Sequence, residues 1–170
     1  MTHFNKNIQI YMAINIVFEQ CNWQNPEHTG AFLNLLNHYM SDPMGDYPPL
    51  NEHDKQKLLV HLSNHPTVEV LLMKYENDYA GMATTFINYS TFKLKPYMYI
   101  HDVVVLDKYR GKGLGKALIR ELINISENRD YCKLTLEVRE DNPAAQQVYK
   151  NLGFEECKPR MYFWERKITK

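Results

Sequence analysis

The stretch that decides the fold reads Arg110-Gly111-Lys112-Gly113-Leu114-Gly115-Lys116-Ala117, and it links two segments with different hydrophobic periods. Before it, residues 97–106 read YMYIHDVVVL, an apolar run that predicts a strand inside a sheet. After it, apolar residues recur at helical spacing over residues 114–125. The stretch is therefore predicted to be a glycine-rich turn that leads from a strand into the N-terminus of a helix.

A turn of this kind is suited to bind an anion. Glycines let backbone N–H groups come close to a ligand, and the helix N-terminus adds the positive end of a dipole. Lys108, Arg110, Lys112 and Lys116 bring positive charge to the same place. A phosphate group is the natural ligand, although such a turn can also serve the fold alone.

Two common phosphate motifs do not fit this stretch. A Walker A loop has four residues between its first glycine and the Gly-Lys pair, whereas here three residues separate Gly111 from Gly115-Lys116. Ala117 also lacks the hydroxyl that would bind Mg²⁺. A dinucleotide-binding turn needs its third glycine where this chain has Lys116. Nucleotide binding is therefore the weaker hypothesis.

A second motif follows behind another predicted strand, at residues 133–138. Asn142, Ala145 and Tyr149 stand at i, i+3 and i+7, so that one face of a short helix carries all three. Gly153, in the run Leu152-Gly153-Phe154, is suited to end this helix. The same pattern also fits an amphipathic helix in which Tyr149 is only a half-buried anchor.

The rest of the chain alternates between helical and β-rich segments. Helices are expected over residues 26–40, from a cap at Asn51 to Pro66, and over residues 143–151, and a loop over residues 41–51. Further strands are expected at residues 68–75, 79–89 and 161–168, with a hairpin turn at residues 76–78. This order predicts a mixed α/β fold with a central sheet, in a single domain over residues 1–170.

Composition narrows the function classes. The 170 residues carry 20 Lys and Arg against 20 Asp and Glu, which gives no support for broad binding to nucleic acid or a membrane. Three cysteines without a CxxC pair argue against a disulfide framework, and no metal is expected. The apolar run at residues 8–18 is too short to span a bilayer, and no signal peptide is recognisable. We therefore expect a cytoplasmic protein.

Together, the two motifs resemble the GNAT superfamily of acyl-CoA-dependent N-acetyltransferases. The resemblance covers residues 97–154 and includes the strand IHDVVV, Arg-x-x-Gly-x-Gly at residues 110–115, the strand LTLEV, and Asn-x-x-Ala-x-x-x-Tyr followed by Gly-Phe. It implies antiparallel strands that lead into a parallel pair of strands that splay apart, with helices on both faces of the sheet.

The resemblance also implies acetyl-CoA as co-substrate, bound in the wedge between the parallel strands. Its pantetheine arm would pair with the backbone of Val103, Val104 and Val105 like an added strand. Its pyrophosphate would lie on the backbone amides of Arg110, Gly111, Lys112, Gly113, Leu114, Gly115 and Lys116. Asn142 and Ala145 complete the set of implied cofactor-binding residues.

The implied reaction is direct transfer of acetyl to a primary amine in a ternary complex. The departing thiolate needs a proton, and the resemblance assigns this role to Tyr149, whose reference pKa of about 10 keeps it protonated at neutral pH. His101 and Asp102 are candidates for the base that deprotonates the amine, and they are expected on opposite faces of their strand. Glu137 or a chain of water molecules could serve instead.

The acceptor stays open at this stage. Residues 89–92 (YSTF) resemble a segment of diamine (spermidine/spermine-type) acetyltransferases, although many of those carry Glu-Asp in place of His101-Asp102. Asp42, Asp46 and Glu52 could attract a polycation, or they are solvated loop charges. Other small amines, amino acids, aminoglycosides and protein amino groups are further acceptors. A non-catalytic acyl-CoA-binding module is the alternative function.

The balanced charge conceals a division along the chain. Residues 1–106 hold 6 Lys and Arg against 10 Asp and Glu, whereas residues 107–170 hold 14 against 10. The basic half contains the implied site for an anionic cofactor, so the sequence predicts a bipolar molecule whose acidic half receives a cationic amine. Because relatives in the family dimerise through the C-terminal strand, residues 161–168 are the predicted homodimer interface.

Overall fold

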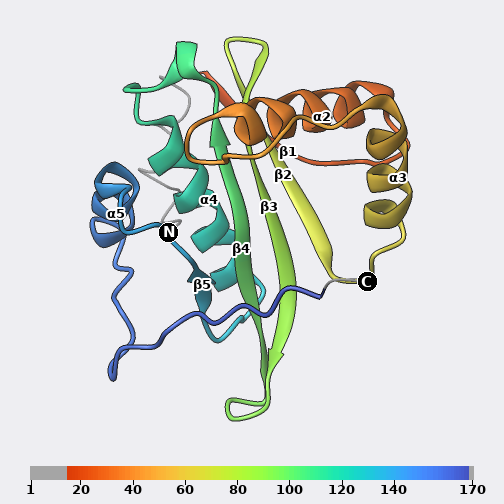
Figure 1. Ribbon diagram of the computed structural model, residues 1–170. Helices are drawn as coiled ribbons and strands as arrows, with labels where there is room; N and C mark the ends of the chain where they lie inside the picture. Colours follow the sequence, from red (N-terminus) through yellow and green to blue (C-terminus); the bar gives the residue numbers. More distant parts are fainter. Residues whose placement is uncertain (1–14, 169–170) are drawn as a thin grey trace, which may run out of the picture.

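The computed structural model describes residues 15–168, so residues 8–14 of the apolar run lie outside the described part. Five strands form one sheet in the order β1-β2-β3-β4-β5 (Figure 1). Their bounds are Ile16–Gln20, Val68–Tyr75, Asp78–Ser90, Lys95–Val105 and Leu134–Leu136. The first four strands pair antiparallel, and β5 pairs parallel to β4.

Helices cover both faces of this sheet, as expected (Figure 1). They are α2 (Pro26–Ser41), α3 (Glu52–Ser63), α4 (Leu114–Asn128) and α5 (Pro143–Lys150), with a 3₁₀ turn η1 (Asp107–Tyr109) before α4. Alternate residues of β2 divide the core, because successive side chains of a strand point to opposite faces. Val70 and Leu72 pack with α2, and Leu71 and Met73 pack with α4.

The strands of the structure differ from the prediction at three places. β1 was missed, since its residues formed part of an apolar run with no alternating pattern. The prediction for residues 133–138 is too long, because β5 is confined to Leu134–Leu136. The prediction of a strand at residues 161–168 is wrong: this segment is irregular, and Trp164 is 87% exposed. A strand needs a hydrogen-bonded neighbour, and no other described strand pairs with this segment.

A bulge in β4 determines where the parallel strands part. Thr84 pairs with Asp102 but Thr85 pairs with Ile100, so His101 is an extra residue in the ladder. β5 pairs with β4 only over residues 98–100. Beyond Ile100 the two strands therefore diverge, as the splayed pair was expected to do.

The bulge also reverses the alternation of β4. Ile100 belongs to the core on the α4 side, whereas Val104 belongs to the core on the α2 side. Tyr99 and His101 make ring contact, and Asp102 is paired with Thr84. His101 and Asp102 consequently both face the α2 side. The expectation that they lie on opposite faces is wrong, because it assumed a strand without a bulge.

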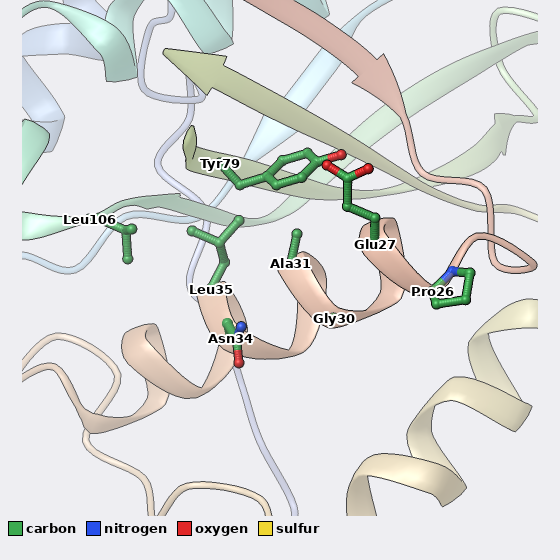
Figure 2. Close-up of a pocket in the computed structure, with 8 residues that line it drawn as sticks. All are labelled: Pro26, Glu27, Gly30, Ala31, Asn34, Leu35, Tyr79 and Leu106. Carbon is green, nitrogen blue, oxygen red and sulfur yellow. The ribbon is translucent and has the colours of Figure 1, made fainter. Parts of the chain in front are cut away.

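A groove of about 400 Å³ runs beside α2, between the helix and the adjoining ends of β3 and β4 (Figure 2). Its lining residues are Pro26, Glu27, Gly30, Ala31, Asn34, Leu35, Tyr79 and Leu106. A Cβ atom added at Gly30 would meet nothing within 4 Å. None of the residues predicted to bind acetyl-CoA or to act in catalysis lines this groove.

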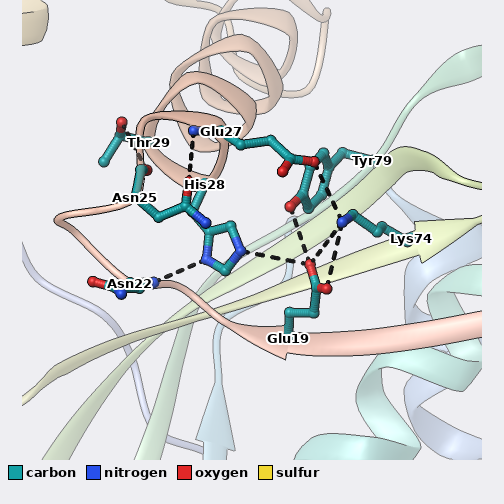
Figure 3. Close-up of polar contacts among 8 residues, drawn as sticks. All are labelled: Glu19, Asn22, Asn25, Glu27, His28, Thr29, Lys74 and Tyr79. Atoms are coloured by element: carbon teal, nitrogen blue, oxygen red, sulfur yellow. Dashed lines mark hydrogen bonds and ion pairs between the residues drawn. The ribbon is translucent and has the colours of Figure 1, made fainter.

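A polar network fixes the N-terminal end of α2 to the sheet (Figure 3). The ammonium of Lys74 lies 3.2 Å from the Glu19 carboxylate and 3.4 Å from that of Glu27. The Tyr79 hydroxyl donates to Glu19 at 3.0 Å. His28 Nε2 lies 3.7 Å from the same carboxylate. Residues of β1, β2 and β3 therefore hold the first turn of the helix.

Two glycines give a matched test of packing. Gly81→Ala would bring a Cβ to 2.5 Å from the Val104 carbonyl oxygen, so β3 and β4 must shift apart and the protein should lose about 1–3 kcal/mol. Gly30→Ala places its methyl in open space within α2 and should stabilise by about 0.5–1 kcal/mol. Urea unfolding measures both changes. Equal effects of the two substitutions would contradict this account of the sheet.

Candidate active site

A cavity of about 360 Å³ lies where β4 and β5 part. The predicted site residues that line it are His101, Val103, Val104, Val105, Arg110, Gly115, Asn142, Ala145 and Tyr149. Those that do not line it are Asp102, Gly111, Lys112, Gly113, Leu114 and Lys116. The two sequence motifs therefore meet at one cavity, although they lie on different elements.

The edge of β4 at this cavity is open for pairing. The N–H of Leu106 points toward β3 and donates to Ala80 at 2.9 Å. Because polar groups of a strand alternate in direction, the backbone N–H and C=O groups of Val103 and Val105 point to the opposite edge. β5 does not reach this far, so an extended ligand can pair with this edge as an added strand.

The glycine-rich turn forms an anion-binding helix end. Gly111 and Gly113 have φ values of 76° and 78°, in the left-handed region that favours glycine. Gly113 is the N-cap residue of α4, and it has no side chain that could accept a hydrogen bond from the first turn. The N–H groups of Leu114, Gly115 and Lys116 also lack intrahelical partners, so they stay available to a ligand. The Leu114 side chain is buried in the core, so only its backbone can serve a ligand. This arrangement fits a pyrophosphate.

Ion pairs link the turn to distant parts of the chain. Lys108 lies 3.0 Å from Asp78, and Arg110 lies 2.8 Å from Asp42. Each pair joins a base of the second half of the sequence to an acid of the first half. The two charge sets are therefore interleaved here, and the predicted bipolar division is wrong at these positions because folding brings opposite charges into contact.

Asp42 is ion-paired and nearly buried, so it is not a solvated loop charge. Its side chain is only 7% exposed. It accepts hydrogen bonds from the Arg110 guanidinium at 2.8 Å and from the Met44 N–H at 2.8 Å. The bond to Arg110 is the main reason why the pKa of Asp42 lies below its usual value. Its charge is thus compensated, which removes it from the acids that could attract a polycation.

Tyr149 enters the cavity from α5. Its ring is partly buried and lies 5.9 Å, between centroids, from the ring of Phe154. Burial, with a smaller contribution from Tyr39, raises the pKa of Tyr149 above its ordinary value. The phenol is therefore protonated at neutral pH and can donate a hydrogen bond.

Tyr39 is a lining residue that the sequence did not single out. It comes from α2, lines the same cavity as Tyr149, and is partly buried. Burial, followed by the charges of Asp102 and Asp42, raises its pKa. In the sequence it matched the apolar stripe of a helix and carried no further signal.

The three candidate bases occupy different surroundings. His101 and Glu137 line the cavity, and both lie near the hydroxyl of Tyr99, which donates to Glu137 at 3.3 Å and is 3.5 Å from His101 Nδ1. Asp102 does not line the cavity. Burial is the main reason why the pKa of Asp102 is raised, opposed by the charge of His101. The structure thus groups His101 with Glu137.

Asn142 has a structural partner within its own motif. It caps α5, and its side-chain oxygen accepts a hydrogen bond from the Ala145 N–H at 3.1 Å. Past the end of the helix, Gly153 has a φ of 87°, and the Phe154 N–H donates to the Tyr149 carbonyl. These contacts fix the position of Tyr149.

Comparison with protein families identifies related sequences. The model of the Acetyltransferase (GNAT) family matches residues 31–154. The ribosomal protein bS18-alanine N-acetyltransferase of Escherichia coli (strain K12) is 38% identical over 65 residues, which cover 38% of this chain and 44% of the relative. The thialysine N-epsilon-acetyltransferase of Bos taurus is 32% identical over 73 residues, covering 43% and 42%. The chain thus spans less than half the length of these relatives.

Solved structures show the same fold. An integron cassette protein from the mobile metagenome of V. cholerae superimposes with a TM-score of 0.73 at 24% identity, covering 91% of this chain and 94% of the other. An aminoglycoside acetyltransferase from a soil metagenome, in complex with sisomicin, gives 0.76 at 16% identity, covering 91% and 97%.

Residues 15–168 show neither a membrane-spanning helix nor a metal-binding cluster. No helix in this range has both the length and the apolar content needed to cross a membrane. No group of three or more His, Cys, Asp or Glu side chains in it is arranged to hold a metal ion.

The ion pair at Asp42 predicts a pH-dependent contribution to stability. A carboxyl whose folded pKa is lowered stabilises above its unfolded pKa of about 3.9, and this contribution is lost as the pH falls through the folded pKa. Asp42→Asn should therefore be less stable than the wild type at pH 7, and the gap should narrow below about pH 4. Urea midpoints between pH 7 and 3 measure this. A gap that does not change with pH would contradict it, and Asp46→Asn is the control.

Proposed function

Because the chain belongs to the GNAT acetyltransferase family, we propose that it transfers an acetyl group from acetyl-CoA to a primary amine. One observation carries the proposal: the open edge of β4, the N-terminal turn of α4 at Gly115 and the hydroxyl-bearing Tyr149 all border the cavity where β4 and β5 part. An extended strand edge, an anion site and a proton donor are what a pantetheine thioester with a pyrophosphate requires.

The residues present fit acetyl-CoA in this place. The N–H groups of Leu114, Gly115 and Lys116 would hold the pyrophosphate, and Val103 and Val105 would pair with the pantetheine arm. Bound acetyl-CoA supplies an activated thioester carbonyl. Tyr149 lines the same cavity, so its hydroxyl would be the group that serves this thioester.

Proton transfers at both ends of the reaction fall to this chain's side chains. His101, with Glu137 as its neighbour through Tyr99, takes a proton from the amine so that the nitrogen lone pair can attack the carbonyl. The nitrogen–carbon bond forms, the carbon–sulfur bond breaks, and the sulfur receives a proton from the Tyr149 hydroxyl. The second proton of the attacking nitrogen then restores the Tyr149 phenol, either directly or through solvent. A backbone N–H at the open edge of β4 stabilises the negative charge on the carbonyl oxygen.

The proposed acceptor is a small amine. Named relatives act on the alanine of a ribosomal protein, on thialysine and on aminoglycosides, so the family name alone does not select among them. The cavity of about 360 Å³ admits a small molecule together with the end of a pantetheine arm. Polyamines remain one member of this class.

The test is an amine panel. Polyamines, aminoglycosides, amino acids and lysine-containing peptides are incubated with acetyl-CoA, and free CoA thiol is measured. We expect thiol release that depends on at least one small amine. Binding of acetyl-CoA without release by any amine would favour the non-catalytic acyl-CoA-binding module instead, and release with peptides alone would contradict the small acceptor.

Tyr149→Phe tests the proton donor. Removing the hydroxyl while keeping the ring should lower kcat by about 10²–10⁴-fold, the usual range for general acid catalysis. The KM for acetyl-CoA should change little, because the ring still packs against Phe154. Steady-state kinetics with the best amine of the panel measure both constants. An unchanged kcat would remove Tyr149 from the mechanism.

The cysteines support the proposal that the chain acts in the cytoplasm. All three are free, and burial raises the pKa of the Cys21 thiol to about 11, which keeps it unreactive. Free thiols are usual in a reducing compartment.

We also propose that the protein forms a homodimer through residues 161–168. This segment runs as an extended chain and exposes Met161, Tyr162, Phe163, Trp164 and Ile168 (Figure 1). β5 lies at the end of the sheet, with β4 on one side only. An exposed apolar segment and an unpaired sheet edge on the same chain can satisfy each other symmetrically between two copies.

Light scattering after size exclusion tests the dimer. The wild type should elute with twice the mass of the chain, and Trp164→Glu should shift the mass toward the monomer. Phe92→Glu is the matched control, because Phe92 is also an exposed aromatic residue but lies in the β3–β4 connection. A wild type that is monomeric over the whole concentration range would exclude this interface.

A further inference from the structure

Helix α2 is tied to the rest of the protein at both ends. The network around Glu19 and Lys74 holds its first turn to β1 and β2. At its other end, Asp42 caps the helix and donates its backbone N–H to the Tyr39 carbonyl at 3.0 Å. This end is also joined to the proposed pyrophosphate site, through the ion pair between the Asp42 side chain and Arg110.

Arg110 makes the contacts that join this end of α2 to the glycine-rich turn. Its guanidinium lies 2.8 Å from Asp42 and 2.9 Å from Asp107 of η1. Its Nε donates to the Val105 carbonyl at 3.3 Å, at the end of the open edge of β4. His38 of α2 adds a contact of 3.4 Å to Asp107. One side chain thus joins the end of α2, the glycine-rich turn and the edge of β4.

The loop after Asp42 is folded around the same residue. The N–H groups of Gly45 and Asp46 both donate to the Asp42 carbonyl at 2.9 Å, and the Tyr47 N–H donates to the Met40 carbonyl at 2.9 Å. Tyr39, one turn before Asp42, lines the cavity that Tyr149 enters. A displacement of Asp42 would therefore move both the loop and a wall of the acceptor side.

We propose that Asp42 is a positioning residue that couples the two substrate sites: through Arg110 it makes the end of α2, Tyr39 and the loop at residues 42–47 respond to occupation of the glycine-rich turn. The proposal rests on the proposed function, since the ligand of the turn is the pyrophosphate of CoA. It adds that the cofactor orders the acceptor side before the amine binds.

The geometry of the Asp42–Arg110 ion pair explains why the two sites would be coupled. A guanidinium holds two carboxylates in fixed directions, and a nearly buried carboxylate such as Asp42 cannot exchange its partner for water at low cost. A pyrophosphate on the turn restricts the backbone that carries Arg110. Arg110 transmits this restriction to Asp42 and hence to the loop. Coupling of binding free energies is reciprocal, so a bound amine should also tighten CoA binding.

Hydrogen exchange with free CoA as the probe tests the coupling without a known acceptor. In the wild type, CoA should slow exchange at residues 111–117 and also, by about fivefold or more, at residues 45–47. In Asp42→Asn, residues 111–117 should still be protected, but the slowing at residues 45–47 should disappear. Arg110→Lys keeps the positive charge but lacks the planar guanidinium, and it should uncouple the loop in the same way.

The ratio of exchange with and without CoA separates coupling from simple loosening. A merely structural role of Asp42 would speed exchange of the free protein and leave the CoA-induced ratio unchanged, which would overturn the proposal. Asp46→Asn is the control, because Asp46 lies in the same loop but outside the contacts of Arg110. Its ratio should equal that of the wild type.

The remaining outcomes are also decisive. Protection of residues 111–117 without any change at residues 45–47 in the wild type would overturn the coupling and leave the proposed function intact. Faster exchange at residues 45–47 would mean that the pyrophosphate draws Arg110 away from Asp42, which also overturns it. No protection anywhere would contradict CoA binding and the coupling together.

Discussion

The extra residue in β4 sets the geometry on which the cavity depends. At His101 the strand gains a residue that its neighbour β3 lacks, and a bulge of this kind bends a strand and increases its twist. β5 can follow β4 only over residues 98–100. The polar groups of Val103 and the N–H of Val105 are left at an open edge, which is ordinarily a liability in a sheet, whereas the Val105 carbonyl accepts a hydrogen bond from Arg110. The proposed co-substrate would pair with this edge and cover it.

Apolar burial and ion pairs have different effects on helix α2. Phe32 and Leu35 are almost fully buried, and such side chains contribute about 1.5–3 kcal/mol each. Partly exposed ion pairs such as Lys74–Glu27 contribute less, because solvent screens their charges. Apolar burial therefore keeps the helix on the sheet. The ion pairs at its two ends, Lys74–Glu27 and Arg110–Asp42, fix its position along the sheet. They therefore also fix the position of Tyr39 in the cavity lining.

Local signals allowed much of the site to be predicted from the sequence. The glycine turn before α4 and the short helix that carries Ala145 and Tyr149 depend on residues that are neighbours in the chain, and both appear as expected. The bulge at His101 could not be predicted, because it depends on the register between β3 and β4. The pair Asp42–Arg110 joins residues 68 positions apart, and neither residue indicates the other. Residues 161–168 have the composition of a strand, but composition does not supply a partner edge.

The charges at the cavity bear on which amine it can receive. Of the acids that line it, Asp42 is compensated by Arg110, and Glu137 accepts one hydrogen bond from Tyr99. A carboxylate has about four lone-pair sites, so Glu137 can still accept from an ammonium group. Arg139, also in the lining, is paired with Asp141 at 2.7 Å. A polyamine would need several spaced anionic partners, and the lining offers one. Under the proposed function, this balance favours an acceptor with a single positive charge near its reacting nitrogen, with the side chains of His101 and Tyr39 in the same lining.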